Sequence, residues 1–234
     1  MKTIAIINDI HGNVEALKVI LKRIDELKVD NVFISGDMIG IGPSHNEVLD
    51  LIKTIPNLEI VKGNHEDYYL KGFNNPGAAL EEKFHNWVKV TMEPKHDEFL
   101  RKLEYIKYFQ IENLKVALLH YPRLDDNSKF HTISKDKSYE CLIEIFGKID
   151  ADICIYGHDH YPSIKIKEKA LINVGTAGCS NINVGYTRFG LLTIDKDKFD
   201  IKVELLKYDI FKEIELLNDN VPDSELIKKI FYKI

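Results

Sequence analysis

An alternation of strands and helices in the first quarter of the chain constrains the fold most. The apolar, β-rich run Thr3–Ile7 predicts a buried strand, and Asn13–Leu27 then repeats apolar residues at the spacing of one helix face. A second strand is predicted at Val32–Ser35. The capping-box pair Ser44 and Glu47 then predicts a helix that runs to Ile52, and a third strand is predicted at Leu58–Val61. This order is typical of a layered α/β fold with parallel strands.

The rest of the chain predicts a second set of strands. Residues 66–105 are mostly helical in character, and a helix is predicted at Tyr139–Ile149 after a polar loop over 121–135. Further strands are predicted at Tyr108–Ile111, Lys115–Leu119, Ile153–Tyr156 and near residues 163–167, 170–174, 185–194 and 199–206, with one clear tail helix at Ser224–Phe231. These strands suggest two sheets packed face to face with helices outside. Because no linker or repeat interrupts the chain, we expect one domain over residues 1–234.

The composition excludes several classes of protein. Apolar residues make up 44% and charged residues 29%, which is ordinary for a soluble globular chain. The formal net charge of −5 argues against binding of long nucleic acid or an anionic membrane through bulk positive charge. The three cysteines form no CxxC pair, so reduced thiols and a cytoplasmic location are expected. No signal-peptide core is evident, and no apolar stretch approaches the ~20 residues of a membrane span.

Four short segments that supply oxygen or imidazole ligands begin where predicted strands end. They are residues 9–13 (DIHGN), 36–37 (GD), 63–66 (GNHE) and 157–160 (GHDH), and His120 directly follows the strand Lys115–Leu119. In open α/β sheets, ligands bind beyond the carboxyl ends of the strands. We therefore expect these segments to meet at one edge of the fold.

The spacing within two of these segments favours a shared ligand. In an extended segment, residues i and i+2 point to the same side, so Asp9 and His11 are expected to reach one metal while Ile10 turns into the core. His158 and His160 have the same spacing. Carboxylates, imidazoles and amide oxygens suit Mn²⁺, Fe or Zn²⁺. Each short match is weak alone, and the complete ordered set carries the interpretation. The remaining histidines are expected to be solvated: His45, His85, His96 and His131.

In this order the segments resemble the motifs of the calcineurin-like metallophosphoesterases, which read D-x-H, G-D, G-N-H-[DE], a separate His and G-H-x-H. The matching residues are Asp9 and His11, Asp37, Asn64, His65 and Glu66, His120, and His158 and His160. The surrounding NDIHGN, ISGDMIGIGP and INVGTAG stretches are most similar to the small prokaryotic YfcE-type phosphodiesterases. The resemblance covers residues 3 to about 194. It implies an α/β fold, a four-layer αββα sandwich of two mixed β-sheets flanked by helices.

The resemblance also implies a centre of two divalent metal ions, with Mn²⁺ favoured and Fe, Ni or Zn²⁺ as alternatives. Asp9, His11, Asp37 and His160 would hold one ion, and Asp37, Asn64, His120 and His158 the other, with Asp37 bridging. A hydroxide that bridges the ions would attack phosphorus. His65, too far for ligation by analogy, would protonate the leaving oxygen or hold a phosphate oxygen. Catalytic roles therefore fall on Asp37, Asn64 and His65, in hydrolysis of a phosphodiester or a dinucleoside polyphosphate such as diadenosine tetraphosphate.

Several residues depart from the family's patterns or lie outside them. Protein phosphatases of this superfamily carry GDxVDRG, but Met38–Ile41 follows Asp37 here, which weakens that interpretation. Arg123 is expected to be a solvated loop residue rather than a phosphate contact, and Arg188 lies in a strand pattern. Cys179 is expected to be a small packed residue. For the aromatic residues in 66–105, ordinary helix packing is favoured over a lid that covers a nucleobase: Tyr68, Tyr69, Phe73, Phe84 and Trp87.

Other functions are consistent with the same fold. A phosphomonoesterase is the close alternative, and short oligonucleotides are a further class of substrate. Some members of the fold, such as the retromer scaffold subunit, bind proteins without catalysis, but the complete set of ligand residues argues against that role here. The expected partner is a small phosphoester, nucleotide-derived in the first interpretation, with no long nucleic acid and no membrane. A homo-oligomer stays open.

Overall fold

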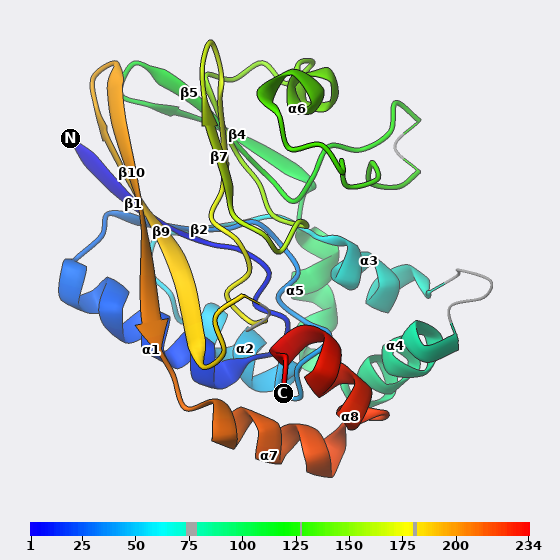
Figure 1. Cartoon of the computed structure of the whole chain (residues 1–234). Helices are drawn as coiled ribbons and strands as arrows, with labels where there is room; N and C mark the ends of the chain where they lie inside the picture. The colour runs from blue at the N-terminus through cyan, green and yellow to red at the C-terminus, as the bar shows by residue number, and fades with distance from the viewer. Residues whose placement is uncertain (74–78, 127, 180–181) are drawn as a thin grey trace.

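Two mixed five-stranded sheets form the centre of the fold (Figure 1). The computed structural model describes residues 1–73, 79–126, 128–179 and 182–234. The first sheet has the order β10-β9-β1-β2-β3, with β1 (Lys2–Ile7), β2 (Asn31–Ile34), β3 (Leu58–Ile60), β9 (Tyr186–Asp195) and β10 (Lys198–Lys207). The second has the order β4-β5-β6-β8-β7, with β4 (Ile106–Ile111), β5 (Leu114–Leu119), β6 (Ile153–Ile155), β7 (Ser163–Ile166) and β8 (Ala170–Asn173).

Three strands of each sheet run parallel to one another. β1 pairs in parallel with β2, and β2 with β3, whereas β9 and β10 join antiparallel. In the second sheet, β5, β6 and β8 are parallel, with β4 and β7 antiparallel at the edges. The parallel strands therefore place their carboxyl ends along one edge of each sheet, where polar segments follow them.

β1 and β2 of the first sheet are buried on both faces, which explains their unbroken apolar character, whereas β10 alternates exposed and partly buried residues. Ile4 and Ile6 of β1 face the second sheet and pack with Leu118 and Ile155 in the core between the sheets. The alternate residues of β1, such as Ile7, face the helices on the outside. The predicted face-to-face packing of two sheets is confirmed.

Helices cover the outer faces and complete the four layers. The outer face of the first sheet lies under α1 (Val14–Leu27), α2 (His45–Ile52), α4 (Ala79–Thr91), α5 (Asp97–Lys102), α7 (Ile210–Asn220) and α8 (Ser224–Ile227). α6 (Tyr139–Phe146) packs on the outer face of the second sheet. α3 (Asn64–Lys71) and two single turns, η1 (Pro94–His96) and η2 (Lys228–Tyr232), complete the described helices. None of the helices in the described ranges is long and apolar enough to cross a membrane.

Three expectations about helices need correction. The helix predicted after Ser44 begins at His45, but the Ser44 side chain makes no capping hydrogen bond. The helix predicted to reach Ile149 ends at Phe146, where Gly147 follows. The tail holds a second helix, α7, which the sequence analysis did not predict; Leu217 of α7 is buried against the helical layer. The predicted helix near Ser224 is present as α8 and η2.

Candidate metal centre

The strand ends bring the predicted ligand residues of both sheets together. Residues after β1, β2 and β3 come from the first sheet, and residues after β5 and β6 come from the second. Side-chain contacts across this edge join His11 Nε2 to His160 Nε2 (2.9 Å), His120 Nε2 to Asn64 Oδ1 (2.8 Å), His120 Nε2 to His158 Nδ1 (3.1 Å) and His120 Nε2 to Asp37 Oδ2 (3.3 Å). Asp9 Oδ1 accepts a hydrogen bond from the backbone N–H of His158 at 2.9 Å.

The backbone that carries these residues is turned rather than extended. Asp9, His11 and Asp37 each have φ of +50°, and His158 has φ of +69°. The expectation that Asp9 and His11 share a side of an extended segment is therefore wrong, although Ile10 is fully buried as expected. Left-handed backbone at a non-glycine residue costs roughly 1–3 kcal/mol and tends to occur at functional sites. The surrounding fold holds these turns in place, for example through the His11 N–H, which donates to the Asp37 carbonyl at 2.9 Å.

The surroundings of His120 favour a positive charge. Its Nδ1–H donates to the backbone carbonyl of Ser35 at 2.9 Å, which leaves Nε2 to face the centre. There Nε2 meets the oxygens of Asn64 and Asp37. A neutral ring would direct its lone pair at both oxygens, which is repulsive. Burial lowers the pKa of His120, but the charges of Asp37, Asp9 and Glu66 and the contact with Asp37 together outweigh it and raise the pKa to about 9. A metal cation bound between His120 Nε2, Asn64 Oδ1 and Asp37 Oδ2 would remove the same repulsion in place of the proton.

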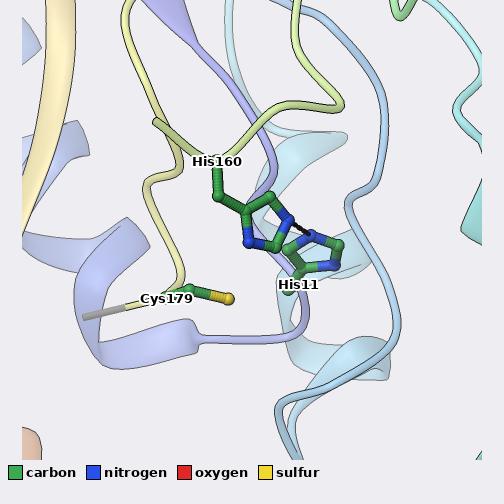
Figure 2. Close-up of side chains that lie close together, drawn as sticks. All are labelled: His11, His160 and Cys179. Carbon is green, nitrogen blue, oxygen red and sulfur yellow. Dashed lines mark hydrogen bonds between the residues drawn. The ribbon is translucent and has the colours of Figure 1, made fainter. Parts of the chain in front are cut away.

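A second group of donors lies around His11 and His160. Figure 2 shows the two rings with one nitrogen of each facing the other, and the Cys179 sulfur directed toward them. The ligand atoms of the three residues lie within 4.8 Å of one another. The structure also separates the two histidines of the 157–160 segment, because His160 meets His11 while His158 meets His120.

The two aspartates at the centre differ in electrostatics. Burial raises the pKa of Asp9 to about 7, and its Oδ2 atom has no hydrogen-bond partner among the described residues. Burial also acts to raise the pKa of Asp37, but the neighbouring rings of His120 and His65 outweigh it and hold that pKa well below its usual range. A buried carboxylate oxygen without a partner is costly. A divalent cation that reached Asp9 Oδ2 would remove this cost, but the groups of ligand atoms that lie within 4.8 Å of one another among the described residues do not include Asp9.

Glu66 organises the loops around Asp37, a role that the sequence analysis did not assign. Its carboxylate accepts backbone N–H groups from Gly63 (2.8 Å), Asp37 (2.9 Å) and Met38 (2.8 Å), with Ile39 at 3.3 Å. Glu66 is fully buried, and burial raises its pKa to about 7. The signal was present in the GNHE tetrapeptide, because an acidic residue three positions after Gly63 is placed to cap the first turn of α3.

His65 lines the cavity beside these groups. Its ring lies edge-on to His11, with the centroids 4.7 Å apart, and a ring nitrogen comes within 4.8 Å of ligand atoms of His11 and Asp37. Nδ1 packs closely against Gly40, because a Cβ on Gly40 would lie 2.1 Å from it. This nitrogen is buried and has no hydrogen-bond partner among the described residues. Nε2 is therefore the ring nitrogen that is able to address a ligand.

Three histidines that were expected to be solvated are buried. His45 is 1% exposed and lies against Trp87, His96 is 0% exposed and contacts Lys53 Nζ at 2.7 Å, and His85 is 8% exposed. His131 is half-buried outside the centre.

Of the two arginines that were considered for phosphate contacts, Arg188 is buried and Arg123 is half-buried, and neither lines the cavity at the centre. Arg123 is not a solvated loop residue, because it stacks 3.9 Å from the Tyr105 ring and pairs with Asp67 at 3.4 Å. Arg188 of β9 donates to Asn183 at 3.0 Å.

A cavity of about 690 Å³ opens onto the centre. Asp37, Asn64, His65, His158 and His160 form its polar floor. Three of the aromatic residues considered as helix packing line its wall: Tyr68, Phe73 and Phe84. A hollow of about 760 Å³ lies over β4, β5 and α6, but it contains none of the predicted ligand residues, so volume alone does not identify the site.

Comparisons with known proteins agree with this geometry. A family model described as the calcineurin-like phosphoesterase superfamily domain matches residues 1–197. An uncharacterised protein of Methanocaldococcus jannaschii is 28% identical over 97% of both chains. A symmetrical bis(5'-nucleosyl)-tetraphosphatase of Baumannia cicadellinicola is 27% identical, over 58% of this chain and 51% of that protein, so the match spans about half of that enzyme. The crystal structure of a metallophosphoesterase from Sphaerobacter thermophilus superposes with a TM-score of 0.77 at 18% identity, covering 100% of this chain and 99% of that one.

Proposed function

Because this chain belongs to the calcineurin-like phosphoesterase superfamily, we propose that it is a phosphodiesterase that works through two divalent metal ions. The proposal treats residues 1–234 as one domain, since the centre takes side chains from both sheets. One ion would be held by Asp9, His11, Asp37 and His160, and the other by Asp37, Asn64, His120 and His158. The observation that carries the proposal is the position of His120 Nε2, which faces Asn64 Oδ1 and Asp37 Oδ2 in a buried site.

Mn²⁺ is the favoured ion, because the ligands mix carboxylate and amide oxygens with imidazole nitrogens; Fe, Ni and Zn²⁺ suit the same set. When bound, the two ions would neutralise charge on the phosphoryl oxygens and activate water. The backbone carbonyl of Ser35 fixes the tautomer of His120, so that Nε2 points inward. Asp37 lies between the two groups, with Oδ2 3.3 Å from His120 Nε2 and 3.9 Å from His11 Nε2. These distances support the proposal that Asp37 would bridge the ions.

His65 is proposed to act on the substrate. Its Nδ1 is buried against Gly40, and its ring borders the cavity floor, so Nε2 is the atom that would hold a phosphoryl oxygen or donate a proton to the leaving oxygen. The backbone N–H of His65 donates to Asp37 Oδ1 at 2.9 Å, which ties the position of the ring to that of the carboxylate. Positioned proton donors of this kind contribute about 10²–10⁴ in rate.

The substrate class follows from the polar floor and the absence of a bulk positive field. The phosphoryl group would lie over Asp37, Asn64 and His65, where the ions provide the positive charge that the acidic chain lacks. A small phosphodiester or a dinucleoside polyphosphate fits this arrangement, and long nucleic acid does not.

The test is hydrolysis of bis-p-nitrophenyl phosphate by the purified chain, with and without Mn²⁺. We expect turnover that depends on the metal and falls about 10²-fold or more in His65→Ala, while Mn²⁺ binding measured by calorimetry persists. His131→Ala, a histidine change outside the centre, is the matched control and should keep full turnover. No turnover in a folded protein that binds Mn²⁺ would refute the diesterase assignment. The same preparation would then be tested with p-nitrophenyl phosphate, a monoester, before a scaffold role is considered.

A further inference from the structure

The cavity over the metal centre has an apolar half that the hydrolytic chemistry does not use. Beside the polar floor, Tyr68 of α3, Phe73, and Phe84 with His85 of α4 line one side, and the Tyr68 and His85 rings lie 5.8 and 5.1 Å from the His65 ring of the floor. Several of these rings contact one another: Tyr68 lies 5.0 Å from Phe73, and His85 lies 4.6 Å from Phe73 and 4.7 Å from Tyr68, between centroids. We call these four residues the aromatic wall. Because its rings support one another, the wall is a preformed surface.

The C-terminal segment also lines this cavity. Ile227 of α8 and Phe231 of η2 line the same cavity. The Phe231 ring lies 6.2 Å from the His160 ring, so it reaches the border of the polar floor. In Figure 1 this segment lies beside α4, near the chain's end. A group attached to a phosphoryl at the floor would therefore extend between Phe231 and the aromatic wall.

Three contacts hold the C-terminal segment in this position. Tyr232, fully buried, donates its hydroxyl to Glu213 of α7 at 3.2 Å. Lys83 of α4 pairs with Asp223, which precedes α8, at 3.2 Å. Ile227 is buried in the helical core. Phe231 itself is half-buried, so it is held by its neighbours while one part of the ring stays open to the cavity.

The charge of the lining restricts what the apolar half accepts. Among the described lining residues there is no lysine or arginine, and beyond the floor the one carboxylate is Glu81. Burial lowers the pKa of His85 to about 3, so its ring is neutral near pH 7. A second phosphate that entered this half would find no counter-charge from the protein and would face an anion. A flat uncharged ring would instead bury its faces against aromatic side chains.

We propose that this half of the cavity binds the nucleobase of a nucleoside bonded directly to the reacting phosphoryl group, and that Phe231 is a specificity-determining residue that stacks on the base. The inference rests on the proposed function, because the floor must hold the phosphoryl group. A base site next to the reacting phosphoryl group would favour nucleoside phosphodiesters over dinucleoside polyphosphates as substrates. The cavity volume of about 690 Å³ lies within the range of ~300–1,000 Å³ that is usual for small-molecule sites.

The test compares two ligands that differ only in the base. Adenosine 5'-monophosphate and ribose 5-phosphate share the phosphate and the sugar, and their binding to the Mn²⁺-loaded protein would be measured by calorimetry. We expect the nucleotide to bind about tenfold tighter or more, as stacking on aromatic side chains provides. Adenosine 5'-diphosphate, with one further phosphate, should bind no tighter than the monophosphate. Equal affinities for the first pair, or much tighter binding of the diphosphate, would overturn the inference.

Variants of Phe231 locate the stacking surface. Phe231→Ala should reduce the preference for the nucleotide several-fold and leave ribose 5-phosphate affinity unchanged. Phe231→Leu keeps an apolar side chain against the core, so it should fold even where the alanine variant loosens the tail, and it should lose the same preference. Phe211→Ala makes the same change at a residue of α7 that is 80% exposed and should have no effect. An unchanged preference in Phe231→Leu would overturn the role of this residue.

Hydrolysis of bis-p-nitrophenyl phosphate by the same preparations separates the two ideas. Metal-dependent turnover without a preference for the base would refute the nucleobase site and leave the proposed phosphodiesterase intact. Absence of turnover in protein that binds Mn²⁺ would refute the proposed function itself.

Discussion

Replacement of Glu66 by Gln is the substitution that most sharply tests how the centre is built. The two side chains have the same shape, but the amide has one acceptor oxygen where the carboxylate has two. Glu66 uses both oxygens: Oε1 accepts from Met38 and Ile39, and Oε2 accepts from Asp37 and Gly63. In either orientation of the amide, its NH₂ group would face two buried N–H donors.

The magnitude follows from those lost bonds. A buried donor left without an acceptor costs about 1–3 kcal/mol, so two of them cost about 2–6 kcal/mol. Part of this is offset, because burial already works against the charged carboxylate and raises its pKa to about 7. We therefore expect Glu66→Gln to lower the free energy of unfolding by about 2–4 kcal/mol. Since Asp37 would shift with its loop, Mn²⁺ affinity should also fall about 10- to 100-fold.

Urea unfolding of the metal-free protein, followed by circular dichroism, measures the first effect, and calorimetry of the refolded protein with Mn²⁺ measures the second. Glu98→Gln is the matched control, because the Glu98 side chain is 80% exposed and its ion pair with Lys102 lies on the surface. That variant should unfold at the urea concentration of the unmodified protein. If Glu66→Gln unfolds there as well, the carboxylate does not hold the loops and the reasoning fails.

Three further predictions concern charge, space and metal. Burial raises the pKa of Glu213 from its ordinary value of 4.5 to about 8. Between these two values the folded protein keeps a proton on Glu213 that the unfolded chain releases. The free energy of unfolding should therefore fall as pH rises from about 5 to 8. Glu213→Gln should remove this loss, so in urea titrations its free energy of unfolding should rise by up to about 1.4 kcal/mol per pH unit relative to the unmodified protein. A difference in free energy between the two proteins that stays constant with pH would contradict the prediction. A Cβ at Gly63 would lie 2.1 Å from Asp37 Oδ1, so Gly63→Ala should lose Mn²⁺ binding in calorimetry, and full affinity would show that the loop yields. Mn²⁺ at 100 times its dissociation constant should stabilise the fold by about 2.7 kcal/mol, which would appear as a rise in Tm. A chelator should reverse this rise, and Asp9→Asn should largely remove it. An unchanged Tm would argue against a metal site in the folded protein.

The strands and the convergence of polar residues could be predicted because each depends on local sequence and one topological rule. Apolar runs predict buried strands, and parallel strands bring their carboxyl ends to one edge, so residues 149 positions apart, such as His11 and His160, meet there. The left-handed turns at Asp9, His11 and Asp37 could not be predicted, since they are imposed by contacts between loops, such as the bond from the His11 N–H to the Asp37 carbonyl. The burial of His45 and His96 depends likewise on distant partners, Thr91 and Lys53.

The floor and the wall of the cavity differ in this respect for a chemical reason. A floor residue such as Asp37 or His158 stands out because a buried charge or imidazole needs a partner, and that need is visible in the sequence as a polar residue at a strand end. Phe84 and Phe231 have no such need. In sequence they cannot be told from Phe146, which is fully buried in the core beneath α6. Only tertiary placement directs Phe84 and Phe231 at the cavity, and α7, whose Glu213 anchors the C-terminal segment, was not predicted. Substitutions in the floor should therefore decide whether a phosphoester is hydrolysed. Substitutions in the aromatic wall and at Phe231 should decide which phosphoester is preferred.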